Sequence, residues 1–168
     1  MKIITVFFNA FRALSWRNIA KLLGLFLRQP LFFILAIYAS AKAYQKAAKI
    51  YPKTASNNGK GNAFRHAYWN CLILMYCCKV SSPQKALKFT EDFTNLHEEL
   101  FPNAPLEKAM DLHNNQVGRA YFMSLLPQIH RQFFETTFFI EGLKQKTETA
   151  QAVSQTGDIP VEGLVYLV

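Results

Sequence analysis

The first ninety residues contain no aspartate or glutamate. Fourteen lysines and arginines precede the first acid, Glu91, whereas residues 91–168 carry eleven acids and five bases. This asymmetry indicates either an anionic partner for the basic half or pairing of the two halves within the fold. Nucleic acid is the least favoured partner, because no DNA- or RNA-binding motif is present. Since the bases are interleaved with large apolar side chains, an anionic membrane surface contacted by residues 1–50 is the favoured external partner.

Cysteine is scarce, and Cys71, Cys77 and Cys78 all lie in one predicted helix. Neighbouring cysteines do not easily form an unstrained disulfide. The lack of a Cys-x-x-Cys pair argues against zinc binding by thiolates. We therefore expect three reduced, buried core residues. Reduced cysteines are typical of a cytoplasmic protein, and an effector that folds in the cytoplasm and is then delivered would look the same.

The chain also lacks any run of about 20 uncharged apolar residues, the length that a membrane-spanning helix needs. Residues 1–27 are rich in aromatic and aliphatic side chains but are interrupted by bases such as Arg17. No convincing signal-peptide cleavage site follows. This pattern predicts a basic amphipathic helix over residues 1–29, which lies in a membrane interface or packs on the core of a helical domain over residues 30–168.

No strand pattern is strong enough to build a sheet. The chain has 168 residues, of which 51% are hydrophobic, enough for one domain with a substantial core. Ser82 is the expected N-cap of one helix, with Pro83 in its first turn. The fold class is therefore an all-α, single-domain bundle of five to six helices, with a polar tail over 147–160 and a short strand or extended tail over 161–168. Turn and capping signals predict the helices after the N-terminal one over 31–50, 62–80, 83–100, 106–126 and 128–146.

Three polar segments interrupt helices that are otherwise apolar. They span residues 61–70, 96–98 and 110–119 and hold three of the four histidines. One face of the first segment is lined by polar residues at every fourth position: Asn62, His66 and Asn70. An unpaired buried polar group costs about 1–3 kcal/mol. Polar groups in three apolar helices therefore favour one shared polar site inside the bundle.

The same segments resemble an uncharacterised family of bacterial helical domains of unknown function. The family's Gly-Lys-Gly-Asp-Ala-x-Arg-His-Ala-x-Trp-Asn pattern corresponds to residues 59–70, its His-Glu pair to residues 97–98, and its Met-Asp-Leu-x-Asn-Asn-x-x-Gly-Arg pattern to residues 110–119. Asn62 stands where that pattern has an acid. The resemblance extends over residues 30–168 and implies no particular activity. Some similar domains lie at the ends of large secreted or toxin-like proteins, which implies an effector role.

Two kinds of chemistry fit these segments, and both draw their catalytic residues from His66, His97, Glu98 and Asp111. In the first, a divalent metal ion such as zinc activates water for hydrolysis. No His-Glu-x-x-His motif is present to specify such a site. In the second, no metal binds, and His66 is a general base oriented by Glu98 or Asp111. The predicted metal ligands are His66, His97, Asp111 and His113.

The predicted substrate-binding residues surround this set, and the two arginines among them would hold an anionic group such as phosphate: Arg65, Trp69, Asn70, Asn114, Asn115 and Arg119. The third interpretation assigns no chemistry to the cluster. In it, Asp111 pairs with Arg65 or Arg119, and the asparagines cap neighbouring backbone in a purely structural network.

The favoured function is a bacterial hydrolase, metal-dependent in the first mechanism, that acts on a membrane-associated or phosphate-bearing substrate. The alternative is a non-enzymatic, membrane-docked effector or an interaction module whose polar core only fixes the fold. The expected location is the bacterial cytoplasm or the periphery of the inner membrane, with delivery as an effector as a further expectation. No feature of the sequence specifies an oligomeric state.

Overall fold

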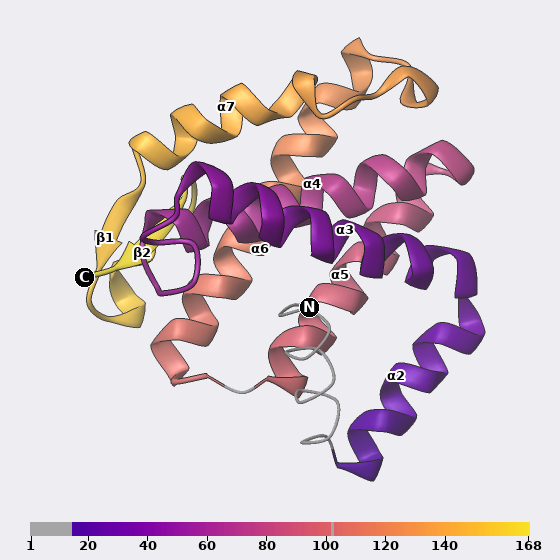
Figure 1. Ribbon diagram of the computed structural model, residues 1–168, viewed down its shortest axis with the longest axis horizontal. Coiled ribbons are helices and arrows are strands. Elements are labelled where there is room, and N and C mark those ends of the chain that lie inside the picture. Colours follow the sequence, from indigo (N-terminus) through magenta and orange to yellow (C-terminus); the bar gives the residue numbers. More distant parts are fainter. Residues whose placement is uncertain (1–14, 102) are drawn as a thin grey trace.

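Helices joined by short connections make up most of the computed structural model, which describes residues 15–101 and 103–168. The predicted all-α, single-domain bundle of five to six helices is confirmed. The predicted N-terminal helix corresponds to α2 from Trp16 onward, and residues 1–14 lie outside the described part. The division of the chain at residue 29 stays a prediction. Six α-helices are described (Figure 1): α2 (Trp16–Arg28), α3 (Pro30–Ile50), α4 (Lys60–Val80), α5 (Pro83–Leu100), α6 (Pro105–Leu125) and α7 (Thr137–Glu148).

Local capping signals set the starts of these helices. The Ser82 hydroxyl accepts a hydrogen bond of 3.3 Å from the Lys85 backbone N–H, and Pro83 occupies the first turn of α5, as predicted. Pro30 and Pro105 occupy the first turns of α3 and α6. A proline is tolerated there because the backbone N–H that it lacks would have no partner within the helix.

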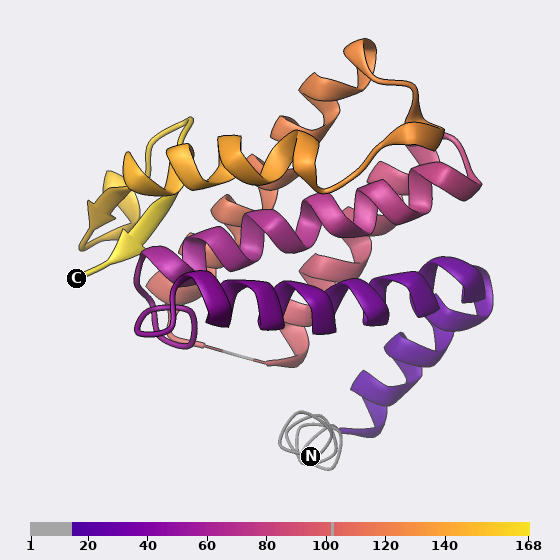
Figure 2. The same cartoon turned by 45° about the horizontal axis from the view of Figure 1, so that its top comes forward.

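α4 lies at the centre of the bundle, with α3 and α7 on opposite sides of it, and it also contacts α5 and α6 (Figure 2). Alanines dominate the buried face of α3 and let it pack closely on α4. α6 approaches α4 closely at Gly118, where a Cβ atom would lie 2.5 Å from the carbonyl oxygen of Ala67. This close approach brings polar side chains of α4 and α6 within hydrogen-bonding distance of one another.

The predicted helix over residues 128–146 is wrong in its first half. Two 3-10 turns stand in its place, at Leu126–Gln128 and Arg131–Phe133. α7 begins only at Thr137. Pro127 lacks a backbone N–H and so disfavours a continuous helix. The chain instead turns inward so that Phe134 is fully buried, with its ring centroid 4.6 Å from that of Phe122.

A small parallel sheet lies at the C-terminal end, which corrects the expectation that the chain builds no sheet. β1 (Gln151–Val153) pairs with β2 (Val165–Leu167), so the predicted polar tail contains a strand, and the short strand expected within 161–168 is confirmed. Asn114 of α6 holds β2 in place. Its Nδ2 donates to the Val165 carbonyl (2.9 Å), and its Oδ1 accepts from the Val165 N–H (3.0 Å). The strands are too short for a sequence pattern to reveal, and a helical side chain anchors one of them.

The three cysteines are free and buried, as expected from composition. Burial raises the pKa of Cys77 to about 12 and the pKa of Cys78 to about 11. Both therefore remain protonated near neutral pH and behave as small apolar core residues.

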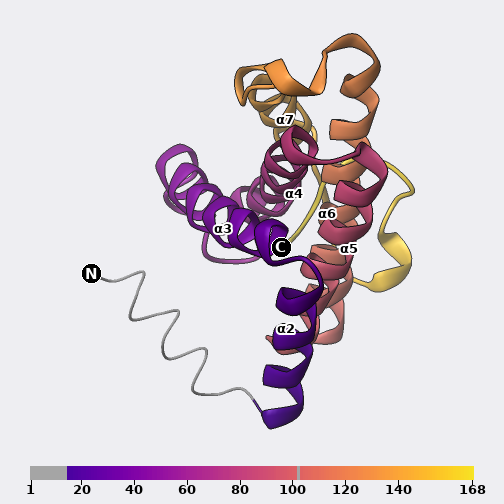
Figure 3. The same ribbon diagram turned by 90° about the vertical axis from the view of Figure 1, so that its right-hand side faces the viewer.

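α2 extends away from the rest of the bundle and contacts α3 and α5 (Figure 3). None of its residues is buried. Among the described residues, no single helix is long and apolar enough to cross a membrane. α2 and α3 meet the criteria of length and composition only as a pair, and the pair is bent by 116°.

Candidate functional site

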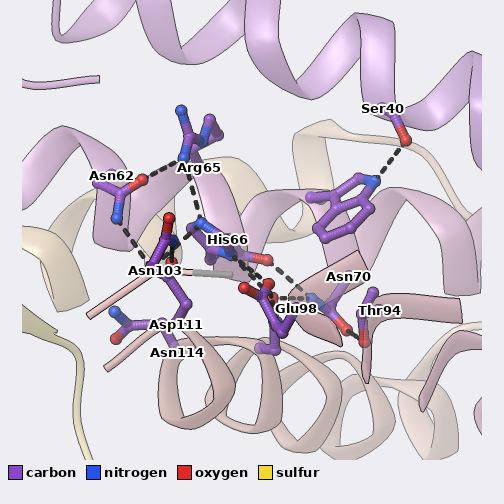
Figure 4. A network of polar contacts seen from close by, with 12 residues as sticks. Ser40, Asn62, Arg65, His66, Asn70, Thr94, Glu98, Asn103, Asp111 and Asn114 are labelled. Carbon is purple, nitrogen blue, oxygen red and sulfur yellow. Dashed lines mark hydrogen bonds and ion pairs between the residues drawn. The ribbon is translucent and has the colours of Figure 1, made fainter. Parts of the chain in front are cut away.

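Polar side chains from α4, α5 and α6 meet inside the bundle (Figure 4). His66 comes from α4, Glu98 from α5 and Asp111 from α6. One nitrogen or oxygen atom of each lies within 4.8 Å of the corresponding atoms of the other two. Their exposed fractions are 3%, 2% and 3%. One imidazole and two carboxylates gathered in this way have the chemistry of a site for a divalent ion.

Neighbouring side chains define the tautomer of His66. Its Nε2 lies 3.2 Å from Nη2 of Arg65, and its Nδ1 lies 3.1 Å from Oδ1 of Asn115. Because a guanidinium only donates, Nε2 is the acceptor and Nδ1–H donates to Asn115. Burial, helped by the nearby Arg65 charge, lowers the pKa of His66 to about 3. The imidazole is therefore neutral, which is the form that binds a metal or accepts a proton.

The two carboxyl groups flank this imidazole. Asp111 Oδ1 lies 3.3 Å from His66 Nε2, and Glu98 Oε1 lies 3.8 Å from His66 Nδ1. Burial, reinforced by the Asp111 charge, raises the pKa of Glu98 to about 7. Burial also raises the pKa of Asp111 to about 6, although a hydrogen bond from Asn62 opposes the change. Burial is the main cause of both shifts, because a carboxylate loses its hydration inside the protein.

Arg65 is the closest fixed positive charge to this set. Its Nη1 donates to the Ala55 carbonyl oxygen at 2.8 Å, and its Nη2 donates to Oδ1 of Asn62. Asn62 in turn donates from Nδ2 to Asp111 Oδ1 at 2.9 Å. Arg65, predicted to bind substrate, is thus held within the cluster, where it compensates part of the charge of Asp111. Burial lowers its pKa from the ordinary value for arginine.

A second polar layer lies behind His66 and fixes its ring. Asn115 accepts a 2.7 Å hydrogen bond from Asn70 Nδ2 through the same oxygen that faces His66, and its own Nδ2 donates to Glu98 Oε1 at 3.2 Å. Arg119 donates to Asn70 Oδ1, at 3.1 Å. Three residues predicted to bind substrate (Asn70, Asn115 and Arg119) therefore support the cluster from within the core. Hydrogen-bond partners of this kind hold the His66 ring and the Glu98 carboxyl group in one orientation.

The consecutive pair His97 and Glu98 divides between two environments. Glu98 points into the cluster, whereas the His97 ring packs between Trp69 and Phe101, with centroid distances of 5.0 and 4.9 Å. Burial, reinforced by the nearby His66, lowers the pKa of His97 to about 3. Adjacent helical residues point about 100° apart, so only one of the two faces the centre. The structure therefore places His97 beside the set of His66, Glu98 and Asp111 and not within it.

Three other predicted site residues have structural partners elsewhere. His113 Nε2 lies 2.7 Å from the carbonyl oxygen of Gly163 and so ties α6 to the C-terminal segment. Asn114 holds β2, as described above. Trp69 donates from Nε1 to Ser40 Oγ at 2.8 Å and links α4 to α3. Of the four predicted metal ligands, the structure brings together His66 and Asp111, with Glu98 in place of the other two histidines.

Two residues that the sequence did not single out complete the network. Thr94, one turn before Glu98 on α5, accepts a 3.1 Å hydrogen bond from Arg119 Nη1. Its four-residue spacing from Glu98 could have identified it in the sequence, because residues four apart share a helical face. Asn103, in the α5–α6 connection, donates to Asp111 Oδ2 at 3.4 Å. No periodic pattern marks a residue in such a connection.

The cluster is enclosed. Two surface hollows of about 440 and 390 Å³ are lined by other residues. Within the described ranges, Gln29 Oε1 is the one buried side-chain nitrogen or oxygen without a hydrogen bond. The polar groups of the cluster thus satisfy one another.

The fold and this cluster define a helical domain with a buried His-Glu-Asp set supported by asparagines and arginines. The chain belongs to the family called domain of unknown function DUF6973, whose sequence profile matches residues 23–151. The resemblance to an uncharacterised domain family is thereby confirmed. No curated protein and no solved structure matches the chain.

Proposed function

We propose that this chain is a hydrolase that uses a divalent cation held by His66, Glu98 and Asp111. The observation that carries the proposal is the convergence of these three ligand groups from three different helices within 4.8 Å. A nitrogen and two carboxylate oxygens suit zinc or a similar ion. The raised pKa values of both carboxyl groups support the same conclusion, because a cation removes the energetic penalty of ionising them.

Bound there, the ion would supply Lewis-acid polarisation of a substrate oxygen. The chain's own residues supply the orientation of the ligands. Asn115 Oδ1 accepts a hydrogen bond from His66 Nδ1–H, and Asn62 Nδ2 donates to Asp111. Arg65, 3.2 Å from His66 Nε2, contributes the permanent positive charge nearest to the set. An anionic oxygen that develops on a substrate would be stabilised by this charge.

The proposed substrate is membrane-associated or phosphate-bearing. The support is the charge distribution, since the half of the chain that contains α2, α3 and α4 carries fourteen bases and no acid up to Glu91. Such a half attracts anionic surfaces and anionic groups. Because the cluster is enclosed, a substrate reaches it only when covering side chains move, whereas a single ion needs a much smaller opening.

Metal content tests this proposal. The chain is purified without a histidine tag, incubated with zinc or manganese, passed through a desalting column and measured by mass spectrometry. We expect one ion per chain, and we expect H66A/D111A to lose it. The matched control is H130A/D158A, which removes the same residue types at exposed positions outside the cluster and should keep the ion.

Hydrolysis of phosphoesters and lipid esters is then measured on the same samples. The expected result is turnover that requires both the ion and the intact cluster. An ion retained equally by H66A/D111A would reject the site. A bound ion with no turnover on any substrate would reject the hydrolase and leave a structural metal.

The second candidate function is a non-enzymatic, membrane-docked effector or interaction module, whose polar cluster only fixes the three helices. One observation favours it. Trp16, Leu23 and Leu27 form an apolar ridge on α2 with exposed fractions of 87%, 53% and 68%. Arg17 and Arg28 lie on the same helix about 100° around its axis from this ridge. An apolar ridge beside a basic stripe is typical of helices that lie in a bilayer interface. Co-sedimentation with anionic vesicles measures this function directly.

A further inference from the structure

A second polar feature lies on the far side of α4 from His66. A groove of about 390 Å³ runs between α3 and α4 and is lined mainly by three tyrosines and three lysines: Tyr38, Lys42, Lys46, Lys49, Tyr68 and Tyr76. Tyr68 follows His66 by two residues, which places it about 200° around the helix axis. The groove and the His66 cluster therefore occupy opposite sides of α4 and share no lining residue.

The groove concentrates positive charge. Lys42, Lys46 and Lys49 are spaced i, i+4 and i+7 on α3, so their ammonium groups lie along one stripe of the helix. No carboxylate lines the groove. None of the ion pairs that the structure describes involves these lysines. Like charges four residues apart repel one another, so an anion between them would relieve a repulsion already present.

The tyrosines add hydrogen-bond donors to this charge. Burial raises the pKa of Tyr68 to about 12, and burial also raises the pKa of Tyr76. Both hydroxyls therefore remain protonated and able to donate at neutral pH. The Tyr38 ring lies 5.3 Å from that of Tyr76 and carries the Lys42 ammonium 5.4 Å from its centroid. This cation–π contact with Tyr38 restricts Lys42 at the edge of the groove.

We propose that the groove between α3 and α4 binds a phosphate-bearing ligand, with Lys42, Lys46 and Lys49 around the anion and tyrosine hydroxyls as donors. Ammonium groups and hydroxyls are the usual protein partners of phosphate oxygens. The phosphate belongs either to a lipid headgroup or to a soluble molecule. Leu31, Tyr38, Lys42 and Lys49 share one face of α3, so the exposed side chain of Leu31 lies on the same face as the groove, nearer the start of that helix. The proposal does not depend on the hydrolase, because its residues are separate.

Binding of two probes distinguishes the sources of the phosphate. Pyrophosphate is titrated by calorimetry, and vesicles of phosphatidylcholine with and without phosphatidic acid are used in co-sedimentation. K42Q/K46Q should weaken binding of the responding probe about tenfold, which corresponds to about 1.4 kcal/mol of binding free energy lost with the two charges. The control K53Q/K85Q removes the same charge at exposed positions outside the groove and should change binding less than about twofold.

Tyr68→Phe tests the contribution of a hydroxyl donor separately from general charge attraction. It keeps the net charge and should still weaken binding about threefold, because one hydroxyl donor is lost. Saturable pyrophosphate binding lost in K42Q/K46Q assigns a soluble ligand. Binding confined to phosphatidic acid vesicles and lost in the same variant assigns a lipid headgroup. No saturable binding of either probe, or equal weakening by both lysine pairs, overturns the site.

Discussion

α4 and α2 distribute polar and apolar residues in opposite ways. α4 has sixteen of its 21 residues buried, and Asn62, His66 and Asn70 are among them. α2 has no buried residue, although it contains Trp16, Leu23 and Leu27. One helix thus places polar groups inside the protein, and the other places large apolar groups outside it.

The contrast indicates where each helix finds its partners. Buried polar groups are tolerated only when they are hydrogen-bonded, and those of α4 find their partners on α6, with Glu98 of α5 3.8 Å from His66 Nδ1. A cluster of exposed apolar side chains is unfavourable in water, and the side chains on the α2 ridge have no such cover among the described residues. The buried face of α4 is therefore completed by other helices of this chain, whereas the exposed apolar ridge of α2 is available for the proposed contact with a bilayer.

The largest expected effect comes from separating α4 and α6. Gly118→Ala would place a Cβ 2.5 Å from the Ala67 carbonyl oxygen, in contact with backbone that cannot move aside easily. We expect a loss of about 3 kcal/mol or more in the free energy of unfolding. Gly24→Ala in α2 is the control, because a Cβ there meets no atom within 4 Å. It should stabilise the chain by about 0.5 kcal/mol, as Gly-to-Ala changes in helices do. Urea denaturation measures both, and equal stability of the two variants would contradict the close approach of α4 and α6.

A smaller effect follows from the raised pKa of Glu98. The carboxyl group has a pKa of about 7 in the folded chain and 4.5 as its ordinary value. Between these values the folded chain holds a proton that the unfolded chain has lost, so the contribution of Glu98 to stability falls as pH rises through this window. Glu98→Gln stays neutral and avoids the decline. In the presence of a chelator at pH 8, we expect it to be more stable than the native chain by about 1–3 kcal/mol, with no difference below about pH 4.5.

Denaturation at pH 4 and pH 8 checks this expectation. Glu99→Gln is the control, because the neighbouring Glu99 is exposed and pairs with Lys21 at the surface. It should show no comparable gain at pH 8. Added zinc should reverse the order at pH 8 by stabilising the native chain and not Glu98→Gln, since the ion binds the ionised carboxylate. A pH-independent difference between Glu98→Gln and the native chain would show that Glu98 ionises normally.

The smallest effect on stability is expected on α2, where the effect on binding should be large. Leu23→Ser and Leu27→Ser together should change the free energy of unfolding by less than about 1 kcal/mol, because both side chains are mostly exposed. Co-sedimentation with anionic vesicles should fall roughly tenfold, since two inserted leucines contribute apolar burial. V161S/V168S removes two other exposed apolar side chains near the C-terminus and should leave vesicle binding unchanged. Equal vesicle binding by the native chain and by both double variants would show that the apolar ridge of α2 does not contact the membrane.

Sequence patterns predicted the helices well where capping and periodicity were local. Ser82 and Pro83 marked the start of α5, and the four-residue spacing of polar residues identified the inner face of α4. The start of α7 was missed, because burial of Phe134 against Phe122 overrides the helical tendency of the segment before Thr137. A contact between residues that lie twelve positions apart does not appear as a periodic pattern in the sequence.

By itself, the sequence determined that the chain forms helices, that its cysteines are reduced core residues and that three segments carry polar groups into an apolar interior. These features depend on residue type and on spacing along one helix. Only the tertiary structure decided that Glu98 and not His97 joins His66 and Asp111, and that His113 and Asn114 hold the C-terminal segment. The rotation and separation of α4, α5 and α6 determine which atoms meet. That separation depends on the contact of Gly118 with Ala67, 51 residues earlier in the chain.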